Sequence, residues 1–149
     1  TLDRNFIKKK SPFLAVKTHV KGGFPKDLVA LHNFKGGYCG VSKVENDIIN
    51  LCYITDFEAF KTYKDIDEFQ EKVIFKNAYL KAIFKNSMPV FDKPLTISQI
   101  SFSRKNPVEN HIIMCGDTAG MIHPLCGNGM SMAIRSAQIA STLIIEFIQ

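Results

Sequence analysis

The chain has 149 residues, of which 46% are hydrophobic and 22% are charged, and its formal net charge is +5. This length is typical of one domain and is enough to bury a core. The composition argues against intrinsic disorder. The lysines are scattered apart from Lys8-Lys9-Lys10, a run that favours a solvated turn over a phosphate or membrane-surface contact. They lack the interleaved aromatic residues of a single-stranded nucleic-acid groove. We therefore expect a folded protein that does not bind nucleic acid.

The cysteines indicate the compartment. Cys39, Cys52, Cys115 and Cys126 show no CxxC spacing, and no secretory leader precedes them. This pattern is typical of reduced thiols in a cytoplasmic protein. No uninterrupted apolar run approaches the ~18 residues that span a bilayer. The sequence thus predicts a cytoplasmic protein with no transmembrane segment.

The first third reads as a set of short strands. Alternating apolar and polar residues, rich in β-branched and aromatic types, predict four of them. They cover Phe13–Val20, Leu28–Phe34, Tyr38–Val44 and Ile48–Ile54. Lys35-Gly36-Gly37 is a hairpin signal between the second and the third. We expect an antiparallel meander.

The middle of the chain changes to helical spacing. Acidic residues begin a helix after Asp65, with apolar residues at Ile66, Phe69, Val73 and Ile74. A second helix is expected over Asn77–Phe84, and a further strand over Leu95–Phe102. We expect these helices to cover one face of the sheet.

The run His111–Cys115 predicts a different kind of strand. Its residues are apolar without alternation, as in a strand of a parallel sheet that is buried on both faces. The other strands of such a sheet would lie outside this sequence. The chain also starts at Thr1 and stops at Gln149 within an apolar helical pattern that lacks a C-cap signal. These features predict a C-terminal fragment whose N-terminal part is missing.

A carboxylate follows that strand directly. Gly116-Asp117 would lie at the carboxyl end of the strand, where open α/β sheets bind their ligands. The glycine would let a ligand approach the backbone, and Asp117 could accept hydrogen bonds from ribose or sugar-alcohol hydroxyls. The alternative is an Asx-turn or a helix cap without a ligand.

A glycine-rich turn leads from Pro124 into the last predicted helix. Gly127-Asn128-Gly129 would leave backbone N–H groups open at the positive end of the helix dipole. Such a site suits an anion, or the partial negative charge of a reduced flavin. The small side chains of Ser131 and Ala133 would let a flat ring approach. An ordinary helix start explains the turn alone equally well.

Together these two features resemble the second FAD-binding motif of the group A flavoprotein monooxygenase and geranylgeranyl reductase superfamily. In that motif a strand ends in Gly-Asp, and a loop with proline and two glycines leads into an alanine-rich helix. The resemblance implies that Gly116-Asp117 binds the ribityl chain of FAD and that Pro124 lies beside the isoalloxazine. It also implies that the backbone of Gly127, Asn128, Gly129 and Met130 faces the pyrimidine end of the ring.

The resemblance implies an α+β fold with two domains. Residues 1–107 would form an antiparallel substrate-binding sheet domain with covering helices. Residues 108–149 would supply the strand, loop and long helix of a Rossmann-like FAD-binding domain of the glutathione-reductase type. The superfamily's GxGxxG segment does not occur in these 149 residues, so we do not expect the chain to hold FAD tightly by itself. Ser131 stands where many hydroxylases have asparagine, which leaves hydroxylation open.

The implied function is that of an FAD-dependent oxidoreductase, a monooxygenase or a reductase, acting on an apolar small molecule. NAD(P)H is a candidate electron donor. The flavin would carry the chemistry, so no catalytic residue is assigned. A non-enzymatic module that binds a lipid or another apolar ligand is the alternative. A third hypothesis is a phosphate-binding module that uses Gly127–Gly129.

Several polar side chains have two interpretations each. His19, His32, Tyr38 and Tyr53 could line a substrate cavity or could pack on the faces of the sheet. His123 could contact the flavin or could simply be a hydrogen-bonded loop residue. Cys126 could be redox-active or attached to the flavin, although packing is favoured. The irregular spacing of His111, Cys115, His123 and Cys126 argues against a metal site, and none is predicted.

Overall fold

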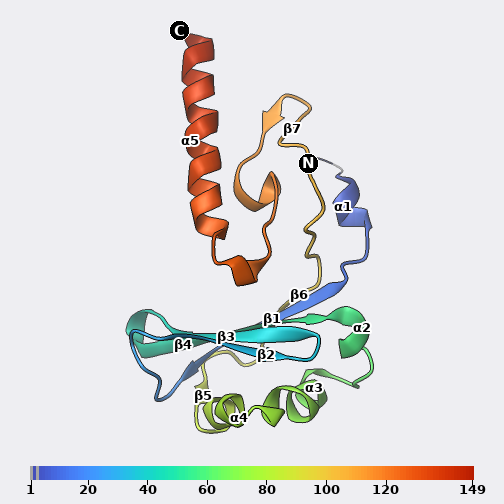
Figure 1. Ribbon diagram of the computed structural model, residues 1–149, viewed down its shortest axis with the longest axis vertical. Helices are drawn as coiled ribbons and strands as arrows, with labels where there is room; N and C mark the ends of the chain where they lie inside the picture. The colour runs from blue at the N-terminus through green and yellow to red at the C-terminus, as the bar shows by residue number, and fades with distance from the viewer. Residues whose placement is uncertain (1, 3) are drawn as a thin grey trace. The chain divides into compact units, whose positions relative to one another are not determined.

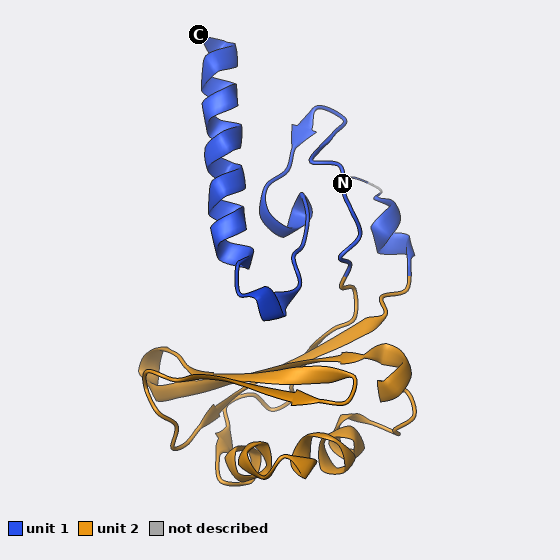
Figure 2. Ribbon diagram, viewed as in Figure 1, with its two compact units in different colours: residues 1–9, 101–149 blue, residues 10–100 orange. Residues whose placement is uncertain are grey.

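The computed structural model describes residue 2 and residues 4–149. It contains two compact units (Figure 2). The sheet unit is residues 10–100, and the terminal unit combines residues 1–9 with residues 101–149. The boundary predicted after residue 107 lies near the second junction, whereas the sequence did not suggest that residues 1–9 join the C-terminal part. The assignment of the two parts to substrate and flavin binding stays a prediction.

The sheet unit is built on a six-stranded antiparallel sheet in the order β2-β3-β4-β1-β5, with β6 also pairing with β1 (Figure 1). The strands are β1 (Phe13–Lys21), β2 (Val29–Phe34), β3 (Gly37–Lys43), β4 (Ile48–Asp56), β5 (Met88–Pro89) and β6 (Leu95–Ile97). A short 3-10 helix, η1 (Glu45–Asp47), joins β3 to β4. The four predicted strands and the β2–β3 hairpin are confirmed.

The predicted four-stranded meander is wrong in one connection. β2, β3 and β4 follow one another in the sheet, but β1 pairs with β4 and not with β2. β1 and β4 match over their full lengths, from Phe13 opposite Asp56 to Lys21 opposite Ile48. Residues 22–28, which join β1 to β2, are too many for a tight hairpin, so the longest complementary strands pair instead.

The strand predicted over Leu95–Phe102 is much shorter in the structure. β6 ends at Ile97, and the chain then leaves the sheet. Ile100 is buried, and its carbonyl oxygen accepts a hydrogen bond of 2.7 Å from Ser11 Oγ. This anchor lies at the end of the sheet unit.

The predicted helices cover one face of the sheet, as expected (Figure 1). Asp65 caps α3, because its Oδ1 accepts the N–H of Glu68 at 2.9 Å. Asn77 caps α4 in the same way through Leu80 N–H at 3.2 Å. The elements on this side are α2 (Phe57–Phe60), α3 (Ile66–Lys72), η2 (Ile74–Lys76) and α4 (Ala78–Lys85).

The strand register divides the side chains between the two faces. The core lies between the sheet and the helices, and it contains Leu14, Val16, Val20, Cys39, Val41, Ile49, Leu51, Tyr53, Phe69, Ile74 and Leu80. His32 stands opposite Cys39, so it belongs to this covered face together with Tyr53. His19 stands opposite Asn50, and Tyr38 stands opposite Ile54, on the other, open face.

The terminal unit contains short elements and one long helix. Its elements are α1 (Asn5–Lys8), β7 (Val108–Glu109), β8 (Ile112–Ile113), η3 (Gly116–Thr118), η4 (Pro124–Cys126) and α5 (Gly129–Ile148). Asn110 and His111 have φ values of 50° and 62°, and they close a tight turn between β7 and β8.

The strand predicted over His111–Cys115 is shorter in the structure, and its burial between strands outside this sequence stays a prediction. β8 has only two residues and pairs antiparallel with β7. Ile112 and Ile113 are about half exposed, because β7 is the one strand that the described part of the chain places beside β8.

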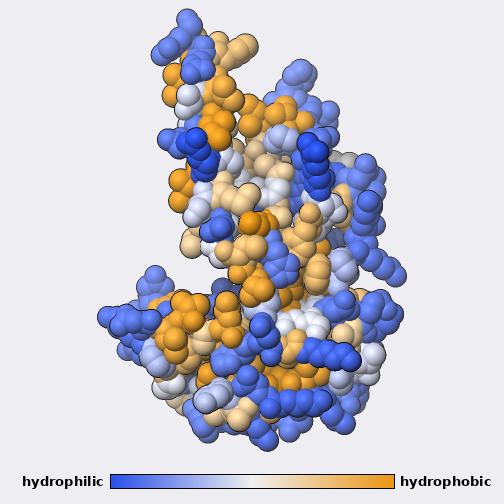
Figure 3. Space-filling view, in the orientation of Figure 1, coloured by the Kyte–Doolittle hydropathy of each residue, from blue (hydrophilic) through white to orange (hydrophobic). Residues whose placement is uncertain are grey.

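The long C-terminal helix is confirmed as α5. Large apolar side chains such as Met130, Ile134 and Phe147 are exposed along it, and Figure 3 shows apolar atoms on its surface. By length and composition alone α5 could cross a membrane, a criterion that core helices of soluble proteins also meet. The expected absence of a transmembrane segment and the cytoplasmic location therefore stay predictions.

Candidate functional site

The Gly116-Asp117 turn is fixed against α5. Gly116 has a φ of +62°, which disfavours any residue with a side chain. Its N–H donates to Ser136 Oγ at 3.0 Å, and a Cβ at this position would lie 3.2 Å from the Cβ of Ala133. The glycine is therefore required by the close approach of α5. The sequence had suggested the approach of a ligand at this position.

The carboxylate of Asp117 is exposed. Backbone bonds close the turn, since the N–H groups of Ala119 and Gly120 donate to Gly116 O at 2.9 and 3.1 Å. Within the described chain the Asp117 carboxylate makes no hydrogen bond or ion pair, so it forms neither an Asx-turn nor a cap. This carboxylate is available to accept hydrogen bonds from a ligand.

The start of α5 leaves backbone donors open. Gly127 is left-handed, with a φ of 68°, and ends η4. The side chain of Asn128 does not cap α5, and its carbonyl oxygen accepts the N–H of Met132 at 3.0 Å. The N–H groups of Gly129, Met130 and Ser131 come before this bond and have no partner within the helix. They face outward at the positive end of the helix dipole.

A small cavity joins the two features. It has a volume of about 220 Å³ and is lined by Gly116, Asp117, Ala119, Gly120, Ile122, Gly129, Met132 and Ser136. A Cβ on Gly120 or Gly129 would meet no atom within 4 Å, so both backbones border open space. The cavity thus combines a free carboxylate, two bare glycine backbones and the start of a helix.

The structure brings together only part of the predicted cofactor site. Gly116, Asp117 and Gly129 line the cavity. Pro124, Gly127, Asn128 and Met130 are not among its lining residues and lie in the adjoining η4 turn and the first turn of α5.

Sequence reasoning missed the remaining lining residues, chiefly Gly120 and Ser136. Gly129, Ala133 and Ser136 are spaced by four and three residues, so they share one face of α5. This stripe of small residues was the available signal for Ser136. The sequence offered no such signal for Gly120, because an isolated glycine in a loop can be present for many structural reasons.

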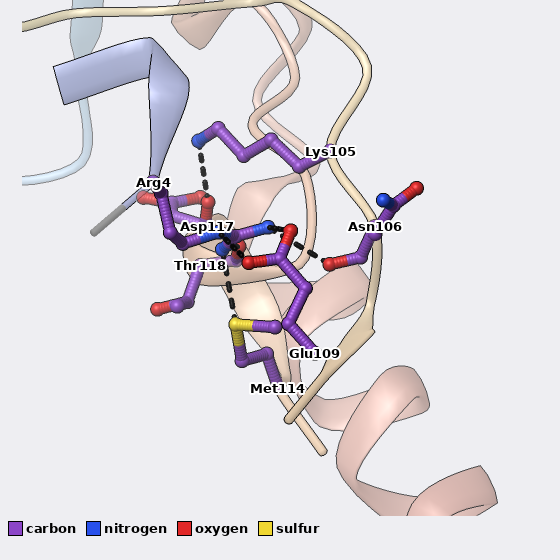
Figure 4. A network of polar contacts seen from close by, with 7 residues as sticks. All are labelled: Arg4, Lys105, Asn106, Glu109, Met114, Asp117 and Thr118. Atoms are coloured by element: carbon purple, nitrogen blue, oxygen red, sulfur yellow. Dashed lines mark hydrogen bonds and ion pairs between the residues drawn. The ribbon is translucent and has the colours of Figure 1, made fainter. Parts of the chain in front are cut away.

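A buried arginine supports the loop after Asp117 (Figure 4). Arg4 is only 6% exposed. Its Nη1 donates to Thr118 O at 2.5 Å, and its Nη2 donates to Asn106 O at 2.8 Å. Its Nε lies 3.3 Å from Glu109 Oε2. Arg4 therefore ties the N-terminal segment to the β7–β8 hairpin and to the loop that borders the cavity.

Lys105 holds the neighbouring carbonyl of the same loop. Its Nζ donates to Asp117 O at 2.8 Å and lies 4.4 Å from the centre of the Phe6 ring. Partial burial, and then the positive charge of Arg4, lower the pKa of Lys105. The backbone carbonyls of Asp117 and Thr118 are thus held by two cations, and the Asp117 carboxylate acts on Lys105 only through its charge.

His123 and Cys126 lie in the loop between η3 and α5. The Nδ1 of His123 accepts the N–H of Leu125 at 3.3 Å, and its ring lies 5.0 Å from that of Phe102, as in a hydrogen-bonded loop residue. Cys126 is exposed. Across the described residues no group of three or more His, Cys, Asp or Glu side chains is arranged to hold a metal ion.

Of the four polar residues predicted in the strands, two lie on the covered face of the sheet and two on its open face. The Nδ1 of His32 lies 3.3 Å from Asn77 Nδ2, and the Tyr53 hydroxyl accepts a hydrogen bond of 3.4 Å from Gln70. Packing therefore accounts for His32 and Tyr53. His19 stacks on Phe91 at 4.8 Å on the open face, where Tyr38 also lies.

Comparison with known proteins finds the fold of this chain in solved flavoproteins. No family model matches the chain. A flavoprotein/dehydrogenase from Cytophaga hutchinsonii superimposes with a TM-score of 0.71 over 91% of this chain and 35% of that protein, at 16% identity. The myxobacterial chondrochloren halogenase, a variant of FAD-dependent halogenases, gives a TM-score of 0.64 over 83% of this chain and 31% of its own, at 15% identity.

One further solved structure is also flavin-dependent, and one relative was found by sequence. A flavin-dependent brominase gives a TM-score of 0.64 over 87% of this chain and 36% of its own, at 19% identity. By sequence, conditioned medium factor receptor 1 of Dictyostelium discoideum is 26% identical over 115 residues, which cover 74% of this chain and 21% of that protein. The chain thus spans about a fifth of the curated relative and about a third of the solved structures.

The resemblance that the Gly-Asp turn and the glycine-rich segment suggested is therefore confirmed at the level of the fold. The chain has the fold of FAD-dependent halogenases and of a flavoprotein/dehydrogenase over about 30% of their length.

Proposed function

We propose that this chain is part of an FAD-dependent oxidoreductase whose terminal unit holds one portion of the flavin. The observation that carries the proposal is the cavity between the Gly116-Asp117 turn and the start of α5. The Asp117 carboxylate makes no hydrogen bond or ion pair within the described chain, and a Cβ on Gly120 or Gly129 would meet no atom within 4 Å.

The residues present fit an edge of the flavin better than the whole dinucleotide. The cavity volume of about 220 Å³ is below the roughly 300–1,000 Å³ of sites that enclose an entire drug-sized ligand. This size agrees with the lack of a GxGxxG segment in the sequence. The ADP part of FAD would need other protein groups.

Each proposed contact follows from the type of group present. Asp117 would accept hydrogen bonds from ribityl hydroxyls, as an ionised carboxylate is an acceptor only. The open N–H groups of Gly129 and Met130, beside Asn128, would stabilise negative charge on the pyrimidine edge of the ring. Gly127 and Pro124 would shape the loop next to the ring.

The bound FAD would supply redox chemistry, and the chain would supply position and electrostatics. The proposal covers hydroxylation, halogenation and reduction, with NAD(P)H as a candidate electron donor.

The proposed substrate is an apolar small molecule. The open face of the sheet exposes Val29, Leu31, Leu95 and Ile97, with exposed fractions of 52–72%. Apolar surface with a few polar groups is typical of small-molecule sites, and the polar groups here are His19, Tyr38 and Asn50. The same face favours the second candidate function, a non-enzymatic module that binds a lipid or another apolar ligand.

Flavin absorbance tests the proposal. The natural protein that contains this chain would be purified, and its visible spectrum would be recorded beside that of Asp117→Asn. We expect bound yellow flavin in the natural protein and a clear loss in the variant. Asp92→Asn is the matched control, since Asp92 is an exposed aspartate of the sheet unit.

A colourless protein that takes up no added FAD would exclude the flavoenzyme and favour the apolar-ligand module. Protection of residues 127–129 by inorganic phosphate in that protein would instead support a phosphate-binding module.

A further inference from the structure

A larger cavity lies in the sheet unit, on the side of the sheet that the helices cover. Its volume is about 570 Å³, and it is bordered by the β2–β3 turn, by α2 and the loop that follows it, and by α3 and η2. This volume falls within the roughly 300–1,000 Å³ of small-molecule sites. None of the residues proposed to hold flavin lines it.

The floor of this cavity is aromatic. Phe69 is 1% exposed and packs edge-on against Phe34 and Tyr63, with ring centres 6.0 and 5.4 Å apart and ring planes 71° and 77° apart. These three rings line the cavity. Because Phe69 also contacts Tyr53 and Phe60, the floor is fixed by the core. Fixed rings of this kind favour a flat apolar body.

The rim of the cavity is positive. Lys35 lies in the β2–β3 turn, and Lys76 lies at the end of η2, so two separate elements each contribute a lysine to the lining of the cavity. Neither lysine makes a hydrogen bond or ion pair through its side chain within the described chain, and none of the lining residues is acidic. The turn that carries Lys35 is anchored, because Gly36 O accepts the N–H of Asp56 at 2.7 Å.

We propose that this cavity binds an amphipathic organic anion. A flat apolar body would contact the partly exposed rings of Phe34 and Tyr63, which the buried Phe69 supports from beneath, and a carboxylate or sulfonate group would lie near Lys35 and Lys76. Two unpaired cations beside a desolvated aromatic floor favour an anion over a neutral molecule of the same shape. This site is separate from the proposed flavin site and does not depend on it.

Two matched probes separate shape from charge. The natural protein that contains this chain, labelled with nitrogen-15, would be titrated with 2-naphthoate and with the neutral 2-naphthamide while the amide NMR signals of this chain's residues are recorded. We expect saturable shifts at residues 33–36, 62–63 and 73–77, with 2-naphthamide binding about tenfold more weakly. Shifts that do not saturate, or that map elsewhere, would overturn the proposal.

Charge removal tests the role of the rim. Lys35→Gln combined with Lys76→Gln should weaken 2-naphthoate about tenfold and leave 2-naphthamide unchanged. Both lysines are exposed, so the fold should be retained, and the amide spectrum reports this directly. The control combines Lys72→Gln with Lys81→Gln, which are exposed lysines of α3 and α4 outside the cavity. Equal binding of 2-naphthoate by the two double variants would also overturn the proposal.

Discussion

At the scale of single residues, the terminal unit depends on one buried cation. Arg4 donates to the carbonyl oxygens of Asn106 and Thr118 and pairs with Glu109. Nothing in the sequence around Arg4 distinguished it from the other basic residues, because its partners lie more than a hundred positions away. Local patterns cannot reveal contacts of that kind.

Arg4→Met should destabilise the terminal unit. The variant keeps an apolar stem but leaves two carbonyl groups and one carboxylate without their donor. Removing one partner of a buried pair costs about 3–5 kcal/mol, and the 31% exposure of Glu109 should reduce this to about 2–3 kcal/mol. Urea unfolding followed by a probe in α5 measures the loss. Arg104→Met, at an exposed arginine of the same unit, should change little; equal stability of the two variants would contradict the role of Arg4.

Two buried groups predict a pH dependence. Burial raises the pKa of the Cys39 thiol to about 12 from its ordinary 9, and that of the Tyr53 hydroxyl to about 12 from 10. Above pH 9 the unfolded chain therefore loses these protons before the folded chain does. The free energy of unfolding should fall as the pH rises from 9 towards 12, by at most about 1.4 kcal/mol per pH unit for each proton.

Urea unfolding at a series of alkaline pH values tests this dependence. Cys39→Ala should reduce the slope, whereas Cys126→Ala, at an exposed thiol, should keep it. The account is wrong on this point if Cys39→Ala leaves the slope unchanged.

At the scale of elements, short-range signals predicted the helices α3, α4 and α5 but missed the one-turn helices α1 and α2 and the pairing of the first strand. Asp65 and Asn77 marked the starts of α3 and α4, since a capping side chain acts within three residues. The pairing of β1 with β4 depends on matching lengths and buried faces between residues as far apart as Phe13 and Asp56, which local spacing does not encode. β8 is an apolar run that the sequence predicts to be buried, but β7 is its only strand neighbour in the described part of the chain, and its side chains are exposed.

The packing of η3 on α5 gives a prediction at this scale. Gly116→Ala should destabilise the protein by about 1–2 kcal/mol, because alanine disfavours a φ of +62° and its Cβ would crowd Ala133. Gly120→Ala should be nearly neutral, since its Cβ would meet nothing within 4 Å. Thermal unfolding compares the two variants. Equal melting temperatures would show that Gly116 is not held against α5.

At the scale of the whole molecule, the α+β class and the long C-terminal helix followed from the sequence, and the fold of known flavoproteins agrees. The candidate site followed in part. Gly116, Asp117 and Gly129 meet at one cavity because a strand–turn–helix pattern is local. The support from Arg4 and the aromatic cavity around Phe69 depend on the tertiary fold, so no spacing in the sequence could show them.

The most direct test of the central claim is the dissociation constant for FAD of the natural protein that contains this chain, measured beside that of Gly129→Ala. Alanine favours a helix start over glycine, so the variant should be as stable as the natural protein or slightly more stable. Gly129 lines the cavity, and an added methyl group would meet no atom of the chain within 4 Å, so we expect it to hinder the bound flavin and not the fold. Gly23→Ala, in open space of the sheet unit, is the control. The account predicts that Gly129→Ala weakens FAD at least about tenfold without loss of stability, and equal affinity in all three proteins would contradict it.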